Sequence, residues 1–369
     1  MLAPVARRRL SALQVEVTSR CTRRCAVCPR SALAARWLEG DLSDEHWERL
    51  RPDLPLVEHV HLQGWGEPLL HPRLESMVRD AHAAGCRVGL TSNGDLLAEA
   101  IDWIVAAQVD VVAVSVAGSD EWNRRLRDDA RSSRILKALA EVARVRGTRE
   151  RPRLHVSFLL VRGNAGDLPE VVRAAAASGA DAVLVNHVEC IPTTELRDLA
   201  AFSERGLTQP DREALEEADH AARALGVDLR LPAMEPQEML ACALDPRVMV
   251  SVRWDGVVAP CIHLNLPISG SIPRMTEKGE VEIQPQRFGH LDDASLSEIL
   301  NGDAYRSFVV PFERRFDADL RFREWGLVAP GWGVVALADI DRAYGELERA
   351  FADYPFPATC DGCPKTVGW

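Results

Sequence analysis

Three cysteines near the amino terminus, Cys21, Cys25 and Cys28, share one short loop with the spacing C-x3-C-x2-C. The loop follows the apolar run Leu13–Val17, which is typical of a β-strand. Three thiolates can ligate three irons of a [4Fe–4S] cube and leave the fourth iron open, whereas most such clusters have four cysteine ligands. A structural zinc site is the alternative, but it needs a fourth ligand, and the nearby histidines do not stand at zinc spacing. The spacing therefore favours a cluster with one open iron.

A second group consists of Cys242, Cys261, Cys360 and Cys363. Four thiolates suit either a structural zinc ion or an iron–sulfur cluster. The segment Met1–Leu10 carries arginines but no apolar core of a signal peptide follows it, so we expect a cytoplasmic protein. In a reducing compartment, clustered cysteines are metal ligands or catalytic groups rather than disulfides.

Two further cysteines, Cys86 and Cys190, stand apart from both groups. Cys86 begins an apolar run, and we expect it to be buried as a small apolar side chain. Cys190 comes shortly after the run Ala182–Val185. A thiol at that place can give a hydrogen atom to a carbon radical, or it can simply pack in a loop, and the sequence leaves both interpretations open.

The formal net charge of −11 argues against nucleic acid as a partner, because phosphate binding requires a basic surface. No apolar run approaches the length that spans a bilayer, so we expect no membrane association.

The order of short apolar runs and amphipathic stretches predicts βα units and a parallel sheet up to about residue 231. Beyond this point the pattern changes to a hairpin at Val248–Pro260 around an Asp-Gly turn, and a helix at Ser295–Phe308. We therefore expect an α/β unit in residues 1–235 and a smaller α+β unit in residues 236–369. The expected strands are Leu13–Val17, His59–Leu62, Arg87–Leu90, Val109–Val116, Leu154–Val161 and Ala182–Val185. The expected helices in between are Ser43–Leu50, Arg73–Ala84, Leu96–Ala107, Ser132–Val145, Leu168–Ala177 and Arg212–Leu225.

Polar motifs stand at the ends of the second, third and fourth of these strands, at the edge where β/α barrels place their active sites. They comprise Gly64-Trp65-Gly66-Glu67-Pro68, then Thr91-Ser92-Asn93-Gly94, then Ser115, with Arg127 or Arg131 just beyond. Glycines permit a close approach of the backbone, and the glutamate offers a carboxylate to an ammonium group. Each motif alone could be an ordinary turn, but their common place at the end of successive strands favours one site.

The cysteine spacing and the order of these motifs resemble the radical S-adenosylmethionine (SAM) superfamily. The resemblance implies a partial (β/α)6 TIM-like barrel, with SAM bound at the open iron of the cluster on Cys21, Cys25 and Cys28. It implies that Gly64, Gly66, Glu67 and Pro68 receive the amino group of SAM, although Trp65 departs from the usual glycine. Ser92, Asn93 and Ser115 would contact the ribose or carboxylate, and Arg127 the carboxylate, with Arg131 as the alternative. A flavodoxin- or ferredoxin-type reductant is the implied partner.

The carboxyl-terminal part resembles the twitch domain, a shortened form of the SPASM domain in the same superfamily. The resemblance implies one auxiliary [4Fe–4S] cluster on Cys242, Cys261, Cys360 and Cys363. The full SPASM form would need further cysteines for a second auxiliary cluster. The expected cofactors are thus two [4Fe–4S] clusters and SAM. Segment 314–358 matches no known pattern, and we expect it to cover the site, form an interface or pack locally.

Twitch enzymes of this size resemble epimerases (isomerases) and dehydrogenases (oxidoreductases) of antibiotic and other carbohydrate pathways. We therefore predict an epimerase that inverts a hydroxyl-bearing carbon of a small-molecule substrate, a sugar or aminoglycoside intermediate, with Cys190 returning the hydrogen atom. The first alternative is a dehydrogenase that passes an electron to the auxiliary cluster, with His187 or Glu189 as base. Maturation of a ribosomal peptide is the second, but the residues before the first strand leave no room for a peptide-recognition domain. The third is a non-catalytic iron–sulfur or zinc protein.

Overall fold

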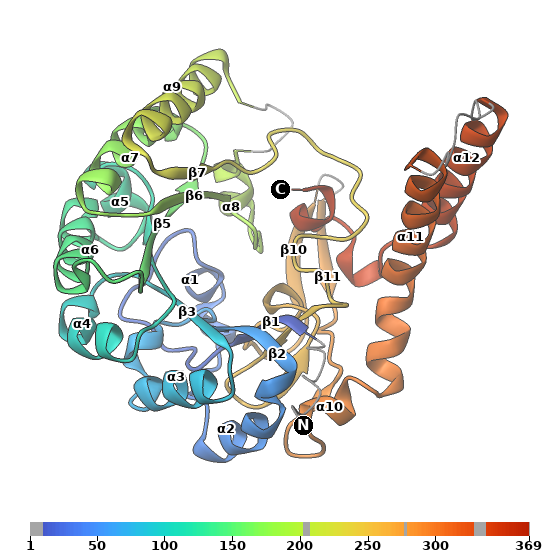
Figure 1. The fold of residues 1–369 in the computed structure, drawn as a ribbon, viewed down its shortest axis with the longest axis horizontal. Coiled ribbons are helices and arrows are strands. Elements are labelled where there is room, and N and C mark those ends of the chain that lie inside the picture. Colours follow the sequence, from blue (N-terminus) through green and yellow to red (C-terminus); the bar gives the residue numbers. More distant parts are fainter. Residues whose placement is uncertain (1–9, 202–206, 277–278, 328–336, 369) are drawn as a thin grey trace.

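A ten-stranded sheet organises the protein, with the strand order β12-β9-β8-β1-β2-β3-β4-β5-β6-β7. The computed structural model describes residues 10–201, 207–276, 279–327 and 337–368. Neighbours in the run from β1 to β7 are all parallel, and helices cover the outer side of this curved sheet (Figure 1). The fold is thus the predicted partial barrel of βα units. Its strands are β1 Leu10–Val15, β2 Val57–Leu62, β3 Arg87–Ser92, β4 Val111–Val116, β5 Arg153–Leu160, β6 Ala182–His187 and β7 Asp228–Arg230.

The long helices between these strands agree with the amphipathic pattern of the sequence. They are α2 Asp44–Leu50, α3 Leu74–Ala83, α4 Leu97–Ala106, α6 Ser132–Arg146, α7 Leu168–Ala177 and α9 Gln209–Leu225. The sequence did not predict β7 or the short helices α1 Pro29–Ala32, α5 Asp120–Leu126 and α8 Thr194–Leu199. The three helices have only one or two turns and β7 has three residues, so all of them are too short to show a periodic pattern.

Burial alternates along the barrel strands and divides their side chains between two faces. In β3, Val88 and Leu90 are almost fully buried, whereas Thr91 is half-buried; in β4, Val114 and Val116 are buried and Ser115 is half-buried. Successive side chains of a strand point to opposite faces, so the buried set packs under the helices. Each such aliphatic side chain contributes roughly 1.5–3 kcal/mol. The half-buried polar set lines the concave inner face.

The second part of the chain continues the same sheet. Strands β8 Met249–Val252 and β9 Val257–Ala259 form the predicted antiparallel hairpin around Gly256, whose φ is 89°. Strand β8 lies parallel to β1, and β12 Gly289–His290 pairs with β9. The boundary expected at residue 235 therefore falls in the connection from β7 to β8, and the sheet runs on across it. A separate ribbon of β10 Ile272–Thr276 and β11 Gly279–Ile283 was not predicted.

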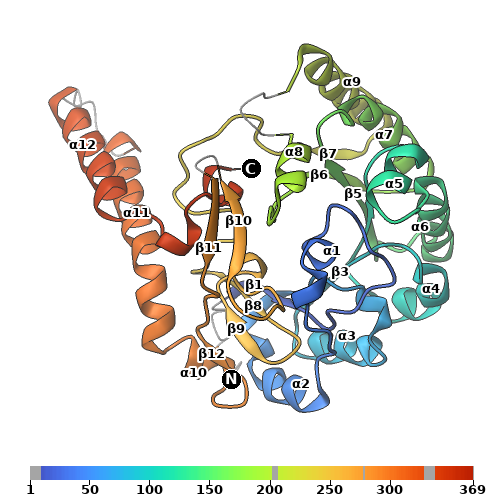
Figure 2. The same cartoon turned by 180° about the vertical axis from the view of Figure 1, so that it is seen from behind.

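The helix expected at Ser295–Phe308 is in fact two helices. Leu300–Gly302 separates α10 Leu296–Ile299 from α11 Asp303–Leu327. Helix α11 packs against α12 Leu337–Asp353, and the pair projects from the second part away from the barrel (Figures 1 and 2). The described residues of segment 314–358 therefore do not cover the barrel opening; residues 328–336 of this segment lie outside the described ones. Among the described helices, none is both long and apolar enough to cross a membrane.

A buried carboxylate links the barrel to α10 and gives a stability prediction. Asp53, which is 7% exposed, accepts hydrogen bonds from the backbone N–H (3.0 Å) and the hydroxyl (2.8 Å) of Ser297. Asp53→Ala leaves both donors without this acceptor, so we expect a loss of about 1–3 kcal/mol of stability. Thermal unfolding followed by circular dichroism measures it. The control is Glu48→Ala, because Glu48 is exposed and pairs with Arg51 at the surface; equal midpoints for the two variants would contradict the prediction.

Candidate active site

The three-cysteine loop lies between β1 and α1, at the carboxyl edge of the parallel strands. Cys28 is the residue before α1, and its N–H donates to the carbonyl of Cys25 (3.1 Å). The N–H of Ala26 donates to the carbonyl of Leu126 at the end of α5 (2.9 Å). The loop is therefore held both by its own turn and by the segment after β4.

The segment after β3 also holds this loop. The side-chain amide of Asn93 donates to the Thr22 hydroxyl (2.9 Å) and lies 3.6 Å from the Cys21 sulfur. Asp95 accepts from the same hydroxyl (2.8 Å) and forms an ion pair with Arg23. Hydrogen bonds to cysteine sulfurs tune iron–sulfur clusters. Asn93 thus stands at the cysteine loop, where its amide can act on a cluster ligand.

The donor set of the loop suits a metal cluster. Burial raises the pKa of Cys25, and it raises the pKa of Cys28 to about 12. The charges of the other loop thiolates raise both pKa values further. Buried thiolates of this kind need a positive partner, and metal ions supply one because ligation requires the deprotonated sulfur.

Arg127 lies beside this loop, as its predicted role requires. Its positive charge opposes the burial that raises the pKa of Cys25. Its side chain is buried, and Nε has no hydrogen-bond partner among the described residues. The alternative, Arg131, instead contributes its charge at Asp120, whose pKa is lowered by hydrogen bonds from the serines that open α6. Of the two arginines, Arg127 is the one placed to meet an anionic group at the cluster loop.

The glycines of the Gly64–Pro68 loop are required by packing against the end of β1. A Cβ at Gly66 would lie 2.2 Å from the carbonyl oxygen of Thr18 and 2.5 Å from that of Arg20. A Cβ at Gly64 would lie 2.1 Å from Cγ of Glu16. Pro68 then starts a short 3-10 turn. The loop after β2 is therefore pressed against the segment that leads into the cysteine loop.

The Glu67 side chain is turned into the protein and accepts hydrogen bonds from two backbone N–H groups. It is 1% exposed, and it accepts from the N–H groups of Asn93 (2.7 Å) and Leu69 (3.2 Å). Burial raises the pKa of Glu67 to about 7 against these hydrogen bonds. Its side chain thus ties the loop after β2 to the loop after β3.

Ser92 also has a structural place. It is 1% exposed, its hydroxyl accepts from the N–H of Gly94 (3.0 Å), and it hydrogen-bonds to Glu67. Because side chains alternate along β3, Thr91 rather than Ser92 reaches the inner face. The sequence motif contained both residues but did not show the register that decides between them.

The inner face of the barrel is polar but carries little charge. His61 lies 2.6 Å from the Gln63 amide oxygen and 3.2 Å from the Thr91 hydroxyl, and burial lowers its pKa, so the ring is neutral. Ser115 lies beside Ser157 in the register of β4 and β5. The amide of Asn186 donates to the Ser157 hydroxyl (3.0 Å). The resulting lining offers hydroxyl, amide and imidazole groups.

The second group of four cysteines converges from three distant segments. Cys242 lies in the connection from β7 to β8, Cys261 follows β9, and Cys360 and Cys363 lie in turns near the carboxyl terminus. The charges of Cys242, Cys360 and Cys363 each raise the pKa of Cys261, which places all four within electrostatic range. Burial raises the pKa of Cys242 to about 11 and that of Cys360 to about 12. Four free cysteines, of which Cys360 is buried and the others are half-buried, suit a four-thiolate cluster.

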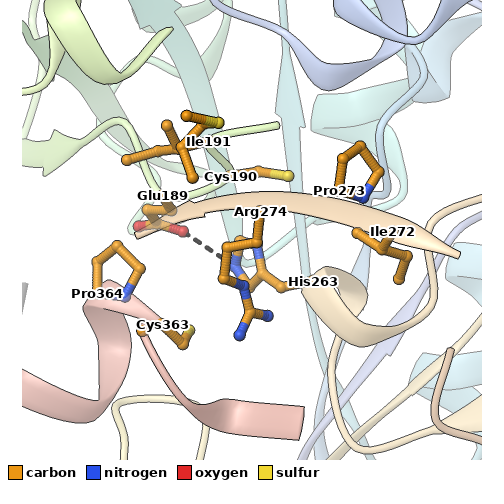
Figure 3. A pocket seen from close by; sticks show the side chains of 11 residues that line it. Glu189, Cys190, Ile191, His263, Ile272, Pro273, Arg274, Cys363 and Pro364 are labelled. Carbon is orange, nitrogen blue, oxygen red and sulfur yellow. Dashed lines mark ion pairs between the residues drawn. The ribbon is translucent and has the colours of Figure 1, made fainter. Parts of the chain in front are cut away.

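Cys190 lies between the two groups of cysteines. It follows β6 and lines a small pocket together with Glu189, His263, Arg274 and Cys363 (Figure 3). Burial raises its thiol pKa, and the charges of Cys28 from the first group and Cys363 from the second raise it further. Cys86 is different: it is 5% exposed beneath the sheet, and its thiol donates to the carbonyl of Leu54 (3.2 Å).

The residues expected as bases for an oxidation both have other partners. Glu189 forms a half-buried ion pair with Lys365 and lies 3.3 Å from His263 (Figure 3). The hydrogen bond with His263 and the charge of Lys365 lower the pKa of Glu189 to about 2 against the effect of burial. His187 follows Asn186 and therefore points to the opposite face, where its Nε2 lies 3.2 Å from the carbonyl oxygen of Ala233. Neither side chain stands ready to take a proton from a substrate.

Trp65 is a site residue whose role the sequence did not reveal. Its indole N–H donates to the carbonyl of Ile262 (3.3 Å), and its ring meets the edge of the His263 ring at 5.6 Å between centroids. It joins the loop after β2 to the residues that follow Cys261. The signal in the sequence was an aromatic residue where the motif usually has glycine.

Comparisons with known proteins agree with this geometry. Residues 15–175 match the family model of the radical SAM superfamily, and residues 242–322 match that of an iron–sulfur cluster-binding domain, SPASM. The chain belongs to the radical SAM superfamily and carries a cluster-binding domain of the SPASM/twitch subgroup. The radical SAM domain implies that the protein binds a [4Fe–4S] cluster and SAM. The SPASM domain implies that it also binds auxiliary iron–sulfur clusters.

Individual proteins show the same relationship. A Pyrococcus furiosus protein named tungsten-containing aldehyde ferredoxin oxidoreductase cofactor-modifying protein is 26% identical over 305 residues, which are 80% of this chain and 82% of that protein. SuiB of Streptococcus suis has a TM-score of 0.61 at 14% identity, over 82% of this chain and 68% of that one. The enzyme anSMEcpe with bound AdoMet has a TM-score of 0.58 at 14% identity, over 93% and 97% of the two chains.

The packing of Gly66 gives a prediction for SAM binding. Gly66→Ala forces a Cβ against two backbone carbonyls, and such overpacking costs roughly 1–3 kcal/mol. We expect the affinity for SAM to fall about 5- to 150-fold, measured by equilibrium dialysis of cluster-reconstituted protein. Gly166→Ala is the matched control, because a Cβ there meets nothing within 4 Å. Wild-type affinity in Gly66→Ala would contradict the role of this close approach.

Proposed function

We propose that the protein is a radical SAM epimerase that inverts a hydroxyl-bearing carbon of a small molecule. Cys21, Cys25 and Cys28 would hold the SAM-binding cluster, and the second group of four cysteines an auxiliary cluster. A reduced cluster with bound SAM supplies a 5′-deoxyadenosyl radical, which takes a hydrogen atom from a substrate C–H bond. The observation that carries the proposal is the place of Cys190, on a pocket wall between the two groups of cysteines.

In this reaction Cys190 returns a hydrogen atom to the substrate radical. The S–H bond breaks, a new C–H bond forms on the other face of the carbon, and the configuration is inverted. A thiyl radical remains on the sulfur, and one electron from a flavodoxin- or ferredoxin-type reductant with one proton restores the thiol. Burial keeps the thiol protonated before the transfer.

The inner face of the barrel supports a hydroxylated, uncharged substrate such as a sugar or cyclitol. Its lining residues carry hydrogen-bonding groups, and the buried imidazole of His61 is neutral. Groups of this kind orient hydroxyls by hydrogen bonds. The fold is shared with SuiB, which has been solved with its precursor peptide SuiA, and the Pyrococcus relative is named for cofactor modification. An activity test should therefore include peptides and cofactor precursors as candidate substrates in addition to sugars.

The second candidate is oxidation of a carbinol, because Cys190 and the auxiliary cysteines are neighbours and a cluster there could accept an electron. The partners of Glu189 and His187 weigh against it, since an oxidation needs a base for the released proton. Epimerisation and oxidation predict different products from the variant Cys190→Ala.

We predict that Cys190→Ala forms no epimer and yields an oxidised product or only 5′-deoxyadenosine. The measurement is product analysis by mass spectrometry and NMR in deuterated water, where the wild-type product should gain one deuterium at the inverted carbon. Cys86→Ala is the control, because that cysteine lies beneath the sheet away from the site. Full turnover by Cys190→Ala, or a wild-type epimer without solvent deuterium, would refute the thiol role.

The two cysteine groups predict a defined metal content. Anaerobically reconstituted protein should contain about eight iron and eight sulfide ions per chain, as two [4Fe–4S] clusters require. Replacing Cys21, Cys25 and Cys28 together by alanine should lower each count to about four and abolish SAM cleavage. Zinc instead of iron in the remaining site, or an unchanged iron content, would show that the assignment of ligands is wrong.

A further inference from the structure

Arg274 is a buried cation that the reaction described above does not use. It lies on β10 and is 7% exposed. Within the described ranges, no carboxylate lies at ion-pair distance from its guanidinium; the ion pairs found there join other residues, including Glu189 with Lys365. An unpaired buried charge is costly, and proteins therefore place such a group against an opposite charge.

The hydrogen bonds of Arg274 direct it to the carboxyl-terminal cysteine turn. Its Nη1 donates to the carbonyl oxygens of Thr359 (3.0 Å) and Asp361 (2.8 Å), the residues on either side of Cys360. The side chain also lines the pocket that contains Cys190 and Cys363 (Figure 3). A guanidinium has five N–H donors, so these two bonds leave further donors for the pocket.

Arg274 is therefore a buried positive charge beside two cysteines of the auxiliary group. Its two hydrogen bonds flank Cys360, and it shares the pocket wall with Cys363 and Cys190. A cluster with four thiolate ligands carries a net negative charge, and nearby charge is one of the factors that set its reduction potential.

We propose that Arg274 is the positive counter-charge of the auxiliary cluster and raises the reduction potential of that cluster. The inference rests on the ligand assignment made under the proposed function. One-electron reduction adds a negative charge to the cluster, so a guanidinium beside it stabilises the reduced form more than the oxidised form. The residue is a positioning residue in this sense: it acts through the cluster and through the turn that carries Cys360.

The test uses the full-length chain in which Cys21, Cys25 and Cys28 are alanine, so that the auxiliary cluster is observed alone. The midpoint potential is measured by redox titration with electron paramagnetic resonance. At a fixed ambient potential, Arg274→Gln should lower the ratio of reduced to oxidised cluster about tenfold or more, as expected for loss of a unit charge several ångströms away. Arg274→Lys keeps the charge but not the paired carbonyl bonds, and should stay within about threefold of the parent.

A matched control separates the charge effect from general destabilisation. Arg315 is also a buried arginine of this part, but it donates to the carbonyl of Met239 (2.6 Å) and lies over the rings of Phe351 and Phe356. Arg315→Gln should leave the potential unchanged even where it lowers the unfolding temperature. If Arg274→Gln loses its iron, retention of iron and potential by Arg274→Lys supports the proposal, and loss of iron there as well overturns it.

Two further outcomes would overturn the proposal. One is an unchanged potential in Arg274→Gln with full iron content, and the other is an equal fall in the Gln and Lys variants, which would assign the effect to the carbonyl bonds. The protein in which only Cys21, Cys25 and Cys28 are alanine tests the assignment of the four auxiliary cysteines as cluster ligands. If it binds no iron at all, the four cysteines do not hold a cluster, and the role of Arg274 fails with them.

Discussion

Strand β1 is the central constraint of this structure because it pairs in parallel with strands on both sides. On one side it pairs with β2, and the loop after β2 packs so closely on the segment after β1 that Gly64 and Gly66 have no room for a Cβ. On the other side it pairs with β8, which carries β9 and then Cys261. The loop of Cys21–Cys28 leaves the carboxyl end of the same strand. One ladder of hydrogen bonds therefore places the strand before the three-cysteine loop, the strand before the Gly64–Pro68 loop and the hairpin before Cys261 side by side.

Polar contacts then fix the geometry at this edge. Glu67 and Asn93 join the loops after β2 and β3 to each other and to the cysteine loop. Trp65 reaches across to the residue after Cys261, and the ion pair of Glu189 with Lys365 holds the segment after β6 to the carboxyl-terminal turn. Buried polar groups of this kind are costly unless they are paired. Cys190 lies in this same region, between the two groups of thiols.

Several of these residues hold neighbouring loops together through their side chains. Glu67 and Ser92 are almost completely buried, and both side chains accept hydrogen bonds from backbone N–H groups of the protein. Arg127 and Arg274 are buried cations beside cysteines, one in each group. Each group of cysteines thus has one buried arginine beside it, which adds a positive charge to that of the metal ions. The two sites are alike in this respect.

The sequence by itself determined the βα order, the long helices between the barrel strands, the Asp-Gly hairpin and the two groups of cysteines, because periodicity and spacing are local properties of the chain. It could not determine which side of a strand each residue faces, so it chose Ser92 instead of Thr91. It also could not show that Glu67, Glu189 and Trp65 have partners from 26 to 197 residues away. Only the tertiary structure decides these contacts, since they depend on strand register and on the return of the carboxyl-terminal turn to the barrel edge. The place of Cys190 between Cys28 and Cys363 follows from the same long-range packing.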